Sequence, residues 1–397
     1  MSLNETPTAE RVHIAFFGRR NAGKSSLINA VTGQEVSVVS ETKGTTTDPV
    51  SKSMELFPLG PVVILDTPGY DDEGTLGTLR VRRTKQTLNR SDIAVLVVDS
   101  SVGIQDCEEE LLRLFQEKNL PFLVVWNKVD LLPNGQGILA GHLAVSTVQG
   151  TGLEEFKTAL GKFVNVRKPR PFLADLIAPG ETVLFVMPQD GSAPRARLIL
   201  PQQMAIRDVL DAGGRALCVQ PPECAGAIAS LKTPPAIVVT DSQVFREAAA
   251  ATPAEIPLTS FSILLARYKG FLAEALRGVE AISRLKSGDK ILIAEGCTHH
   301  RQCNDIGSVK IPNLLRKKCG CDFDFQFSSG NGFPEDLEGL SLVIHCGGCM
   351  ISDRELLSRM KAAQDQNVPF TNYGITLAWL NGILPRALTG LRGKTEC

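Results

Sequence analysis

One short segment, Gly18 to Ser25, constrains the fold more than any other part of the chain. It reads G-x-x-x-x-G-K-S and follows directly on the β-prone run Val12 to Phe17. The glycines let the backbone curl so that successive N–H groups point at phosphate oxygens. Lys24 adds a cation for the β- and γ-phosphates, and Ser25 offers a hydroxyl to magnesium. The segment therefore predicts a strand, a phosphate-binding loop and a helix, in that order.

Two further motifs follow later apolar strands. In Asp66 to Gly69, the carboxylate of Asp66 suits the magnesium side, and Gly69 supplies a backbone donor near the γ-phosphate. In Asn127 to Asp130, a carboxylate can accept both N1–H and N2–H of guanine, whereas adenine offers an acceptor at N1 and nothing at C2. Unpaired polar groups make such a site reject the wrong base by roughly 10⁴-fold. We therefore expect GTP, with magnesium, as the nucleotide.

Composition limits the classes of protein that can carry these motifs. The 397 residues are 43% hydrophobic and 21% charged, with a net charge of -1 and no long Lys/Arg run, so we predict no nucleic-acid partner. The first ten residues lack the basic and apolar regions of a signal peptide, and no apolar run approaches the roughly 18 residues of a membrane span. We predict a cytoplasmic protein without a membrane partner. In that compartment ten cysteines favour metal ligation, reactivity or packing over disulfides.

The predicted fold class is α/β throughout, in three domains. Beyond Val166 the segment Lys168 to Pro171 is a stiff, charged connector, as expected at a domain boundary. Short apolar runs then alternate with helix-like stretches, which predicts a small unit with a mostly parallel sheet and no chemical motif. Within it we expect Cys218 to be a core thiol and Cys224 to be exposed. The predicted boundaries are 11–166 for a P-loop nucleotide domain with a mostly parallel sheet, 172–265 for the middle domain and 270–395 for the last domain.

Two cysteine-containing segments in the last domain each follow a predicted strand. They are Cys297-Thr298-His299 and His345-Cys346-Gly347-Gly348-Cys349. In an open parallel sheet, ligands collect at the carboxyl ends of strands, so both segments can converge on one metal site.

The identity of the metal stays open on the residues alone. Three close cysteines suit a 4Fe-4S cluster with one iron left for a different ligand. A Cys-x-x-Cys pair with a further cysteine and a histidine equally suits tetrahedral zinc. Gly296, Gly347 and Gly348 favour close backbone approach and N–H donation to cluster sulfides, which tilts the prediction slightly toward iron and sulfur.

Residues 11 to 165 resemble the branch of P-loop GTPases that includes TrmE, Era and Der, on the motifs quoted above. The resemblance implies that Thr46 in switch I binds magnesium and that Ser146-Thr147 forms the last base-binding motif. It also implies that Asn21 helps to bind an activating potassium ion; the alternative is a loop residue satisfying its own turn. Tyr70 stands where small signalling GTPases carry glutamine, so intrinsic hydrolysis should be slow. The nucleotide-binding residues are expected to be Gly18, Asn21, Ala22, Gly23, Lys24, Ser25, Ser26, Asn127, Lys128, Asp130, Ser146 and Thr147, and the catalytic ones Lys24, Asn21, Thr46, Asp66 and Gly69.

The whole chain resembles the HydF family of FeFe-hydrogenase maturation GTPases. A GTPase domain, a middle domain without motifs and a C-terminal C-x-H followed by H-C-x-x-C carry that resemblance. It implies a homodimer formed through the middle domain and a 4Fe-4S cluster on Cys297, Cys346 and Cys349. It also implies a scaffold that receives a di-iron precursor, made with the radical-SAM maturases HydE and HydG, and delivers it to apo FeFe-hydrogenase.

The fourth ligand of such a cluster stays open. His299 and His345 fall on the family's histidines, and this chain adds His300 and Cys303 beside them. These four residues, a carboxylate or an exchangeable group are the candidates. The alternative function is a TrmE- or Era-like, RNA-associated GTPase with a C-terminal structural zinc site.

Overall fold

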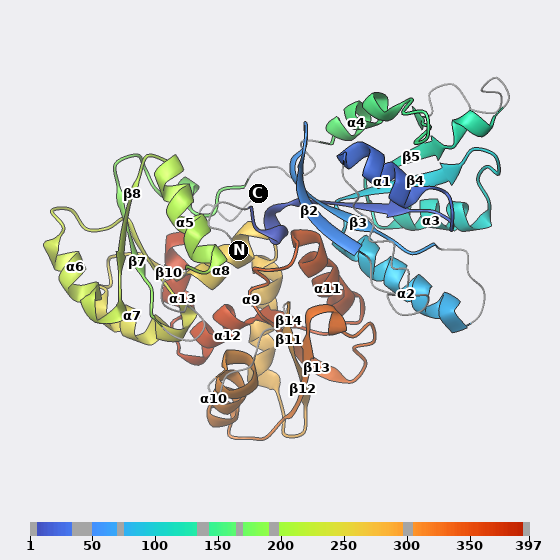
Figure 1. Ribbon diagram of the computed structural model, residues 1–397. Helices are drawn as coiled ribbons and strands as arrows, with labels where there is room; N and C mark the ends of the chain where they lie inside the picture. Colours follow the sequence, from blue (N-terminus) through green and yellow to red (C-terminus); the bar gives the residue numbers. More distant parts are fainter. Residues whose placement is uncertain are drawn as a thin grey trace. The chain divides into compact units, whose positions relative to one another are not determined.

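The computed structural model describes residues 6–33, 50–69, 75–132, 143–163, 170–189, 198–296 and 305–391 (Figure 1). The chain divides into two compact units, residues 1–168 and 169–397. Thr46, Tyr70, Cys297, His299, His300 and Cys303 lie outside the described residues.

The described part of the first unit contains a six-stranded sheet in the order β2-β3-β1-β4-β5-β6. Its strands are β1 (Val12–Phe17), β2 (Val50–Leu56), β3 (Gly60–Asp66), β4 (Ile93–Asp99), β5 (Phe122–Asn127) and β6 (Leu143–Ala144). Only the β2–β3 pair is antiparallel; the other pairs are parallel. This sheet confirms the predicted mostly parallel α/β fold.

Helices cover both faces of this sheet, so its central strands are buried on both sides. The helices are α1 (Lys24–Thr32), α2 (Thr75–Arg90), α3 (Asp106–Glu117) and α4 (Leu153–Gly161). In β4, Val95 and Val97 pack into the core that includes α1 and α4, whereas Leu96 and Val98 pack into the core that includes α3. This alternation follows from the two-residue period of a strand.

The second unit contains two four-stranded sheets, and all their described pairs are parallel. The first has the order β10-β9-β7-β8, with β7 (Thr182–Val186), β8 (Arg215–Val219), β9 (Ile237–Thr240) and β10 (Leu258–Ser260). The second has the order β12-β11-β13-β14, with β11 (Lys290–Glu295), β12 (Asp324–Ser329), β13 (Leu340–His345) and β14 (Phe370–Asn372). Both sheets therefore have the predicted α/β character.

One continuous hydrophobic core joins the two sheets of the second unit. Its helices are α5 (Leu200–Asp211), α6 (Cys224–Ser230), α7 (Phe245–Ala251), α8 (Phe261–Tyr268), α9 (Leu272–Glu280), α10 (Ile311–Cys319), α11 (Asp353–Asp365), α12 (Tyr373–Leu380) and α13 (Leu384–Ala387). Phe261 of α8 stacks on Phe185 of the first sheet, with ring centroids 5.7 Å apart. Phe271 packs against Phe370 of the second sheet at 6.3 Å. The two sequence segments therefore fold as one packed body.

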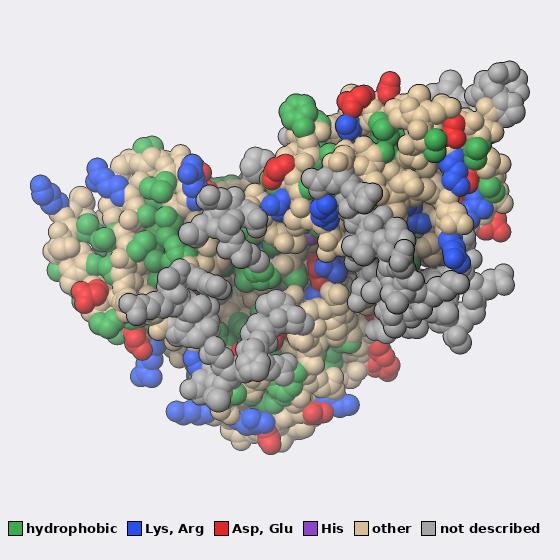
Figure 2. Space-filling model, viewed as in Figure 1, with side chains coloured by type: hydrophobic (Ala, Val, Ile, Leu, Met, Phe, Trp, Pro, Cys, Tyr) green, Lys and Arg blue, Asp and Glu red, His purple; other side chains and the backbone are tan. Residues whose placement is uncertain are grey.

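The expected exposure of two cysteines is reversed. Cys218 is exposed and Cys224 is buried. Cys218 lies in β8, an edge strand whose side chains are at most half-buried, so an apolar run there does not indicate core. Hydrophobic side chains are visible at the surface near β7, β8 and α5 in Figure 2, and Leu210 of α5 is among the exposed ones.

Candidate functional site

The phosphate-binding loop lies between β1 and α1, where two glycines meet neighbouring strands at close range. A Cβ on Gly18, whose φ is 138°, would lie 2.3 Å from the carbonyl oxygen of Val97. A Cβ on Gly23, whose φ is 90°, would lie 2.1 Å from the side-chain nitrogen of Asn127. Only glycine fits these positions. Asn21 in the same loop is exposed and has a left-handed φ of 62°.

Lys24 and Ser25 stand at the start of α1 with partners that a nucleotide and its metal could replace. Lys24 is buried, and its Nζ donates to the carbonyl oxygens of Gly18, at 3.0 Å, and Arg19, at 2.8 Å. Ser25 Oγ donates to Asp66 Oδ2 at 2.6 Å. The site thus joins the predicted cationic, hydroxyl and carboxylate groups.

Asp66 has one buried oxygen, Oδ1, that accepts no hydrogen bond from the described residues. Burial raises the pKa of Asp66, while the hydrogen bond from Ser25 and the charge of Lys24 act in the opposite direction. A divalent cation would compensate a carboxylate in such a position. The donor set therefore fits magnesium.

The base-binding motif follows β5. Asn127 is buried, its Nδ2 donates to the carbonyl oxygen of Ala22 at 3.1 Å, and its Oδ1 has no partner among the described residues. Asp130 Oδ1 accepts a hydrogen bond from Ser146 Oγ at 2.5 Å. The structure thus brings Ser146 to Asp130. Lys128 has a left-handed φ of 62° and forms an ion pair with Asp99 at 2.7 Å.

Arg19 was not among the predicted site residues. Its Nε donates to the fully buried Glu108 at 2.7 Å, and its guanidinium also donates to the carbonyl oxygen of Gly103 at 2.9 Å. These bonds fasten the phosphate-binding loop to the start of α3. The partners are far apart in sequence, so no local pattern could have indicated the contact. Gly69 approaches the same loop, because a Cβ on it would lie 2.6 Å from the backbone nitrogen of Arg20.

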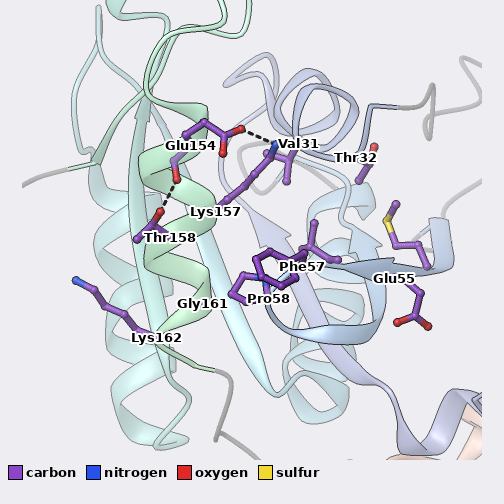
Figure 3. A pocket seen from close by; sticks show the side chains of 12 residues that line it. Val31, Thr32, Glu55, Phe57, Pro58, Glu154, Lys157, Thr158, Gly161 and Lys162 are labelled. Carbon is purple, nitrogen blue, oxygen red and sulfur yellow. Dashed lines mark hydrogen bonds and ion pairs between the residues drawn. The ribbon is translucent and has the colours of Figure 1, made fainter.

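A cavity of about 590 Å³ lies elsewhere in this unit (Figure 3). It is lined by Val31 and Thr32 at the end of α1, by the turn after β2 and by α4. Lys24 stands at the opposite end of α1, so this cavity is not the phosphate site.

In the second unit, the candidate cluster segments follow β11 and β13, which are neighbouring parallel strands. Cys346 N–H donates to the carbonyl oxygen of Ala294 at 2.7 Å. Cys346 Sγ accepts hydrogen bonds from the backbone N–H groups of Gly296, at 3.1 Å, and Gly348, at 3.4 Å. The residue after Gly296 in sequence is Cys297. The residue that immediately precedes the first candidate segment therefore contacts Cys346 of the second.

The surroundings of Cys346 fit a sulfur ligand of a metal centre. Burial raises the pKa of its thiol, and the two glycine N–H groups act in the opposite direction. Amide donors of this kind stabilise a metal-bound thiolate. Cys349 is half-buried on the same loop. The described residues contain no group of three side chains that could hold a metal ion. Of the three predicted cysteine ligands, Cys346 and Cys349 lie within the described residues.

His345 is fully buried, and both of its ring nitrogens are engaged. Nδ1 lies 2.8 Å from the carbonyl oxygen of Cys346, which can only accept, so Nδ1 carries the proton. Nε2 lies 3.1 Å from the guanidinium of Arg359, which can only donate, so Nε2 is the acceptor. Burial and the charge of Arg359 lower the pKa of His345 to about 3. In this arrangement neither nitrogen is available to iron.

A buried polar network was also not predicted, behind residues 346–352, which we call the cluster loop. Arg359 of α11 pairs with Glu355 and donates to the carbonyl oxygen of Gly330 at 2.6 Å. Tyr373 donates its hydroxyl proton to Glu295, at the end of β11, at 3.2 Å. Burial, with the charges around it, raises the pKa of Tyr373 well above its usual value. These residues come from four different elements, which no sequence spacing relates.

Three family models match the chain. The model of the hydrogen maturase F dimerization domain matches residues 172–270, and the model of the hydrogen maturase F tetramerization domain matches residues 273–390. That of the 50S ribosome-binding GTPase matches residues 13–128. The chain belongs to the hydrogen maturase F (HydF) family. Its two family-specific domains support oligomerization, and they do not favour the RNA-associated alternative.

The nucleotide domain is also similar to curated GTPases outside the HydF family. The tRNA modification GTPase MnmE of Bordetella petrii is 32% identical over 152 residues, which are 38% of this chain and 33% of that protein. GTPase Der of Wolinella succinogenes is 40% identical over 132 residues, 32% of this chain and 27% of that protein. The matched part thus spans about a third of these relatives. A crystal structure of Era with MgGDPNP and ribosomal RNA is 20% identical and covers 53% of this chain and 93% of its own, with a TM-score of 0.35.

The match to the GTPase family model supports GTP hydrolysis with magnesium in the first unit of this HydF-family chain. Within the part of the chain that the structure describes, no helix is long and apolar enough to cross a membrane.

Proposed function

We propose that the chain is a GTP-hydrolysing scaffold that assembles or holds a di-iron precursor on a 4Fe-4S-bearing domain and transfers it to apo FeFe-hydrogenase. Its proposed partners are the maturases HydE and HydG, the hydrogenase and a second copy of the chain in a cytoplasmic homodimer. The observation that supports the proposal is the hydrogen bond from Gly296 N–H to Cys346 Sγ, in a HydF-family chain, because Gly296 immediately precedes Cys297 in sequence.

Cys297, Cys346 and Cys349 would hold the cluster. The cluster would supply an iron site with an open position, on which a precursor can be retained. Gly296 and Gly348 would stabilise thiolate charge through their N–H groups. Because both nitrogens of His345 are engaged, we propose that the fourth ligand is His299, His300, Cys303, a carboxylate or an exchangeable group.

In the first unit, the nucleotide would replace internal partners of the loop. Lys24 would exchange its two backbone carbonyls for phosphate oxygens, and Ser25 and Asp66 would turn toward magnesium together with Thr46. Asp130 would accept from guanine while Ser146 holds its carboxylate in place. We further propose that Asn21 helps to bind potassium, which would stabilise charge that develops during hydrolysis.

Metal analysis of the anaerobically purified chain tests the proposal. We expect about four iron and four sulfide per chain and activation of apo FeFe-hydrogenase after exposure to HydE and HydG. Zinc in place of iron and sulfide, or full activation by a cluster-free protein, would contradict it.

A further inference from the structure

A buried lysine outside both motifs reaches the cluster loop. Lys269 directly follows α8, and its side chain is only 1% exposed. Its Nζ donates to the carbonyl oxygen of Ile351 at 2.8 Å and lies 3.1 Å from Asp353 Oδ1. Ile351 comes two residues after Cys349, and Asp353 begins α11. Lys269 therefore holds the segment through which the cluster loop enters the next helix.

Helix α8, which Lys269 follows, also contacts the cluster loop at Gly347 and the neighbouring strand at Asn372. A Cβ on Gly347 would lie 3.4 Å from Leu265 of α8. Asn372, at the end of the neighbouring strand β14, donates its side-chain N–H to the carbonyl oxygen of Ser262 at 3.4 Å. On its other side α8 is anchored in the first sheet through Phe261 and Phe185. The helix thus bridges the first sheet and the cluster loop.

A lysine in such a place requires a reason, because lysines are almost never fully buried unless paired. Its partners here are a backbone carbonyl and the 27%-exposed carboxylate of Asp353. Replacing the pair by apolar groups would avoid the desolvation of two charges. An apolar side chain could not donate a hydrogen bond to the Ile351 carbonyl, however, as Lys269 does.

We propose that Lys269 is a positioning residue for the loop of Cys346 and Cys349. The cluster site would then be built jointly by the segment that matches the dimerization domain, which contains Lys269, and the segment that matches the tetramerization domain, which contains both cysteines. The inference rests on the proposed function in taking this loop to hold the cluster. It makes the geometry of the cluster depend on the middle segment of the chain.

The first test compares Lys269→Met with Lys232→Met, a matched change at an exposed lysine of the same segment. Both proteins are reconstituted anaerobically, and the rate of iron loss to a ferrous chelator is measured together with the EPR spectrum of the reduced cluster. We expect iron loss from Lys269→Met to be about tenfold faster than from wild type, since a hydrogen bond from a charged donor is removed. We also expect a shifted or broadened spectrum. Wild-type iron loss and an unchanged spectrum would overturn the proposal.

A double variant, Lys269→Met with Asp353→Asn, separates positioning from simple charge burial. The double variant leaves no carboxylate without its cation, so we expect it to fold even if the single variant does not, and the same measurements can then be made on it. If Lys269 positions the loop, the double variant should still lose iron about tenfold faster than wild type, because Ile351 still lacks its donor. A double variant with wild-type iron loss would overturn the proposal.

Hydrogen exchange on the cluster-free proteins distinguishes failure of this inference from failure of the proposed function. Amides 347–352 should exchange about tenfold faster in Lys269→Met and in the double variant than in wild type or Lys232→Met. If wild type binds no iron but the exchange difference is present, the proposed function fails and the anchoring role stands. If wild type binds the cluster and exchange is equal in all four proteins, the inference alone fails.

Discussion

The phosphate loop and the cluster loop both follow parallel strands, β1 and β13. They differ in how many of the buried polar atoms around them have hydrogen-bond partners. In the phosphate region, Asp66 Oδ1 and Asn127 Oδ1 are buried without a partner among the described residues, and Lys24 donates to carbonyls of its own loop. Behind the cluster loop, His345 is bonded at both nitrogens, and Arg359 is paired and hydrogen-bonded. This contrast is the one we expect if the first region binds a ligand that is exchanged and the second holds the proposed cluster permanently.

The largest expected effect tests whether the two sites function independently of each other. Cys346→Ser should abolish the cluster, because a serine oxygen is a poor substitute for a thiolate on iron, and hydrogenase activation should be lost with it. GTP turnover should persist, since Cys346 and the nucleotide motifs belong to different compact units. Iron content, GTP turnover and hydrogenase activation should be measured on the same preparations. Joint loss of GTP turnover would show that the units are not separable.

The opposite change should spare the cluster. Lys24→Ala removes the buried cation that would meet the phosphates, and we expect a fall in GTP turnover of about 10²-fold or more. The iron-sulfur absorbance should be unchanged. A kinetic assay and a visible spectrum of one preparation suffice, and a bleached spectrum would contradict the idea of two independent sites.

A smaller effect sharpens the description of the phosphate loop. If Asn21 helps to bind potassium, GTP turnover should be about tenfold faster in potassium than in sodium, as expected for one stabilised charge. Asn21→Ala should lose most of that difference. Equal rates in both salts for the wild-type protein would assign Asn21 to the turn alone.

The smallest effect concerns the buried His345, which immediately precedes the cluster loop. His345 has a folded-state pKa of about 3 against an ordinary value of 6.5, so its contribution to stability is complete above pH 6.5 and is lost as the pH falls toward 3. The apo-protein should lose up to about 1.4 kcal/mol per pH unit in that window from this residue. His345→Gln should be less stable at pH 7 but should show a shallower pH dependence. Urea midpoints at pH 7 and pH 5 for both proteins measure this, and parallel pH dependences would mean that His345 is not buried neutral.

Features that depend on contiguous residues could be predicted from the sequence. The strand, loop and helix around Lys24 and the strands before Cys346 and Asn127 follow from short local patterns, and the structure has them. Exposure was harder to predict, because Cys218 lies on an edge strand and apolar runs look the same at an edge and in a core.

Contacts between distant segments could not be predicted in this way. Three contacts join residues on different segments: Arg19 with Glu108, Arg359 with His345, and Lys269 with Ile351, which are 89, 14 and 82 positions apart. An isolated arginine or lysine in a sequence looks like an exposed charge, which is what most of them are. Only the packing of helices on the sheets shows which cations are buried, and against what.

Because β11 and β13 are paired directly, the distance between their ends does not depend on the number of residues that connect them. Since β12 pairs on the other side of β11, residues added to the exposed turn at Glu338 and Gly339 would enlarge that turn without moving the two strand ends apart. An inserted tag or reporter there should leave the geometry of the proposed cluster site intact. The number of residues between Cys297 and Cys346 could therefore change while the strand order is kept.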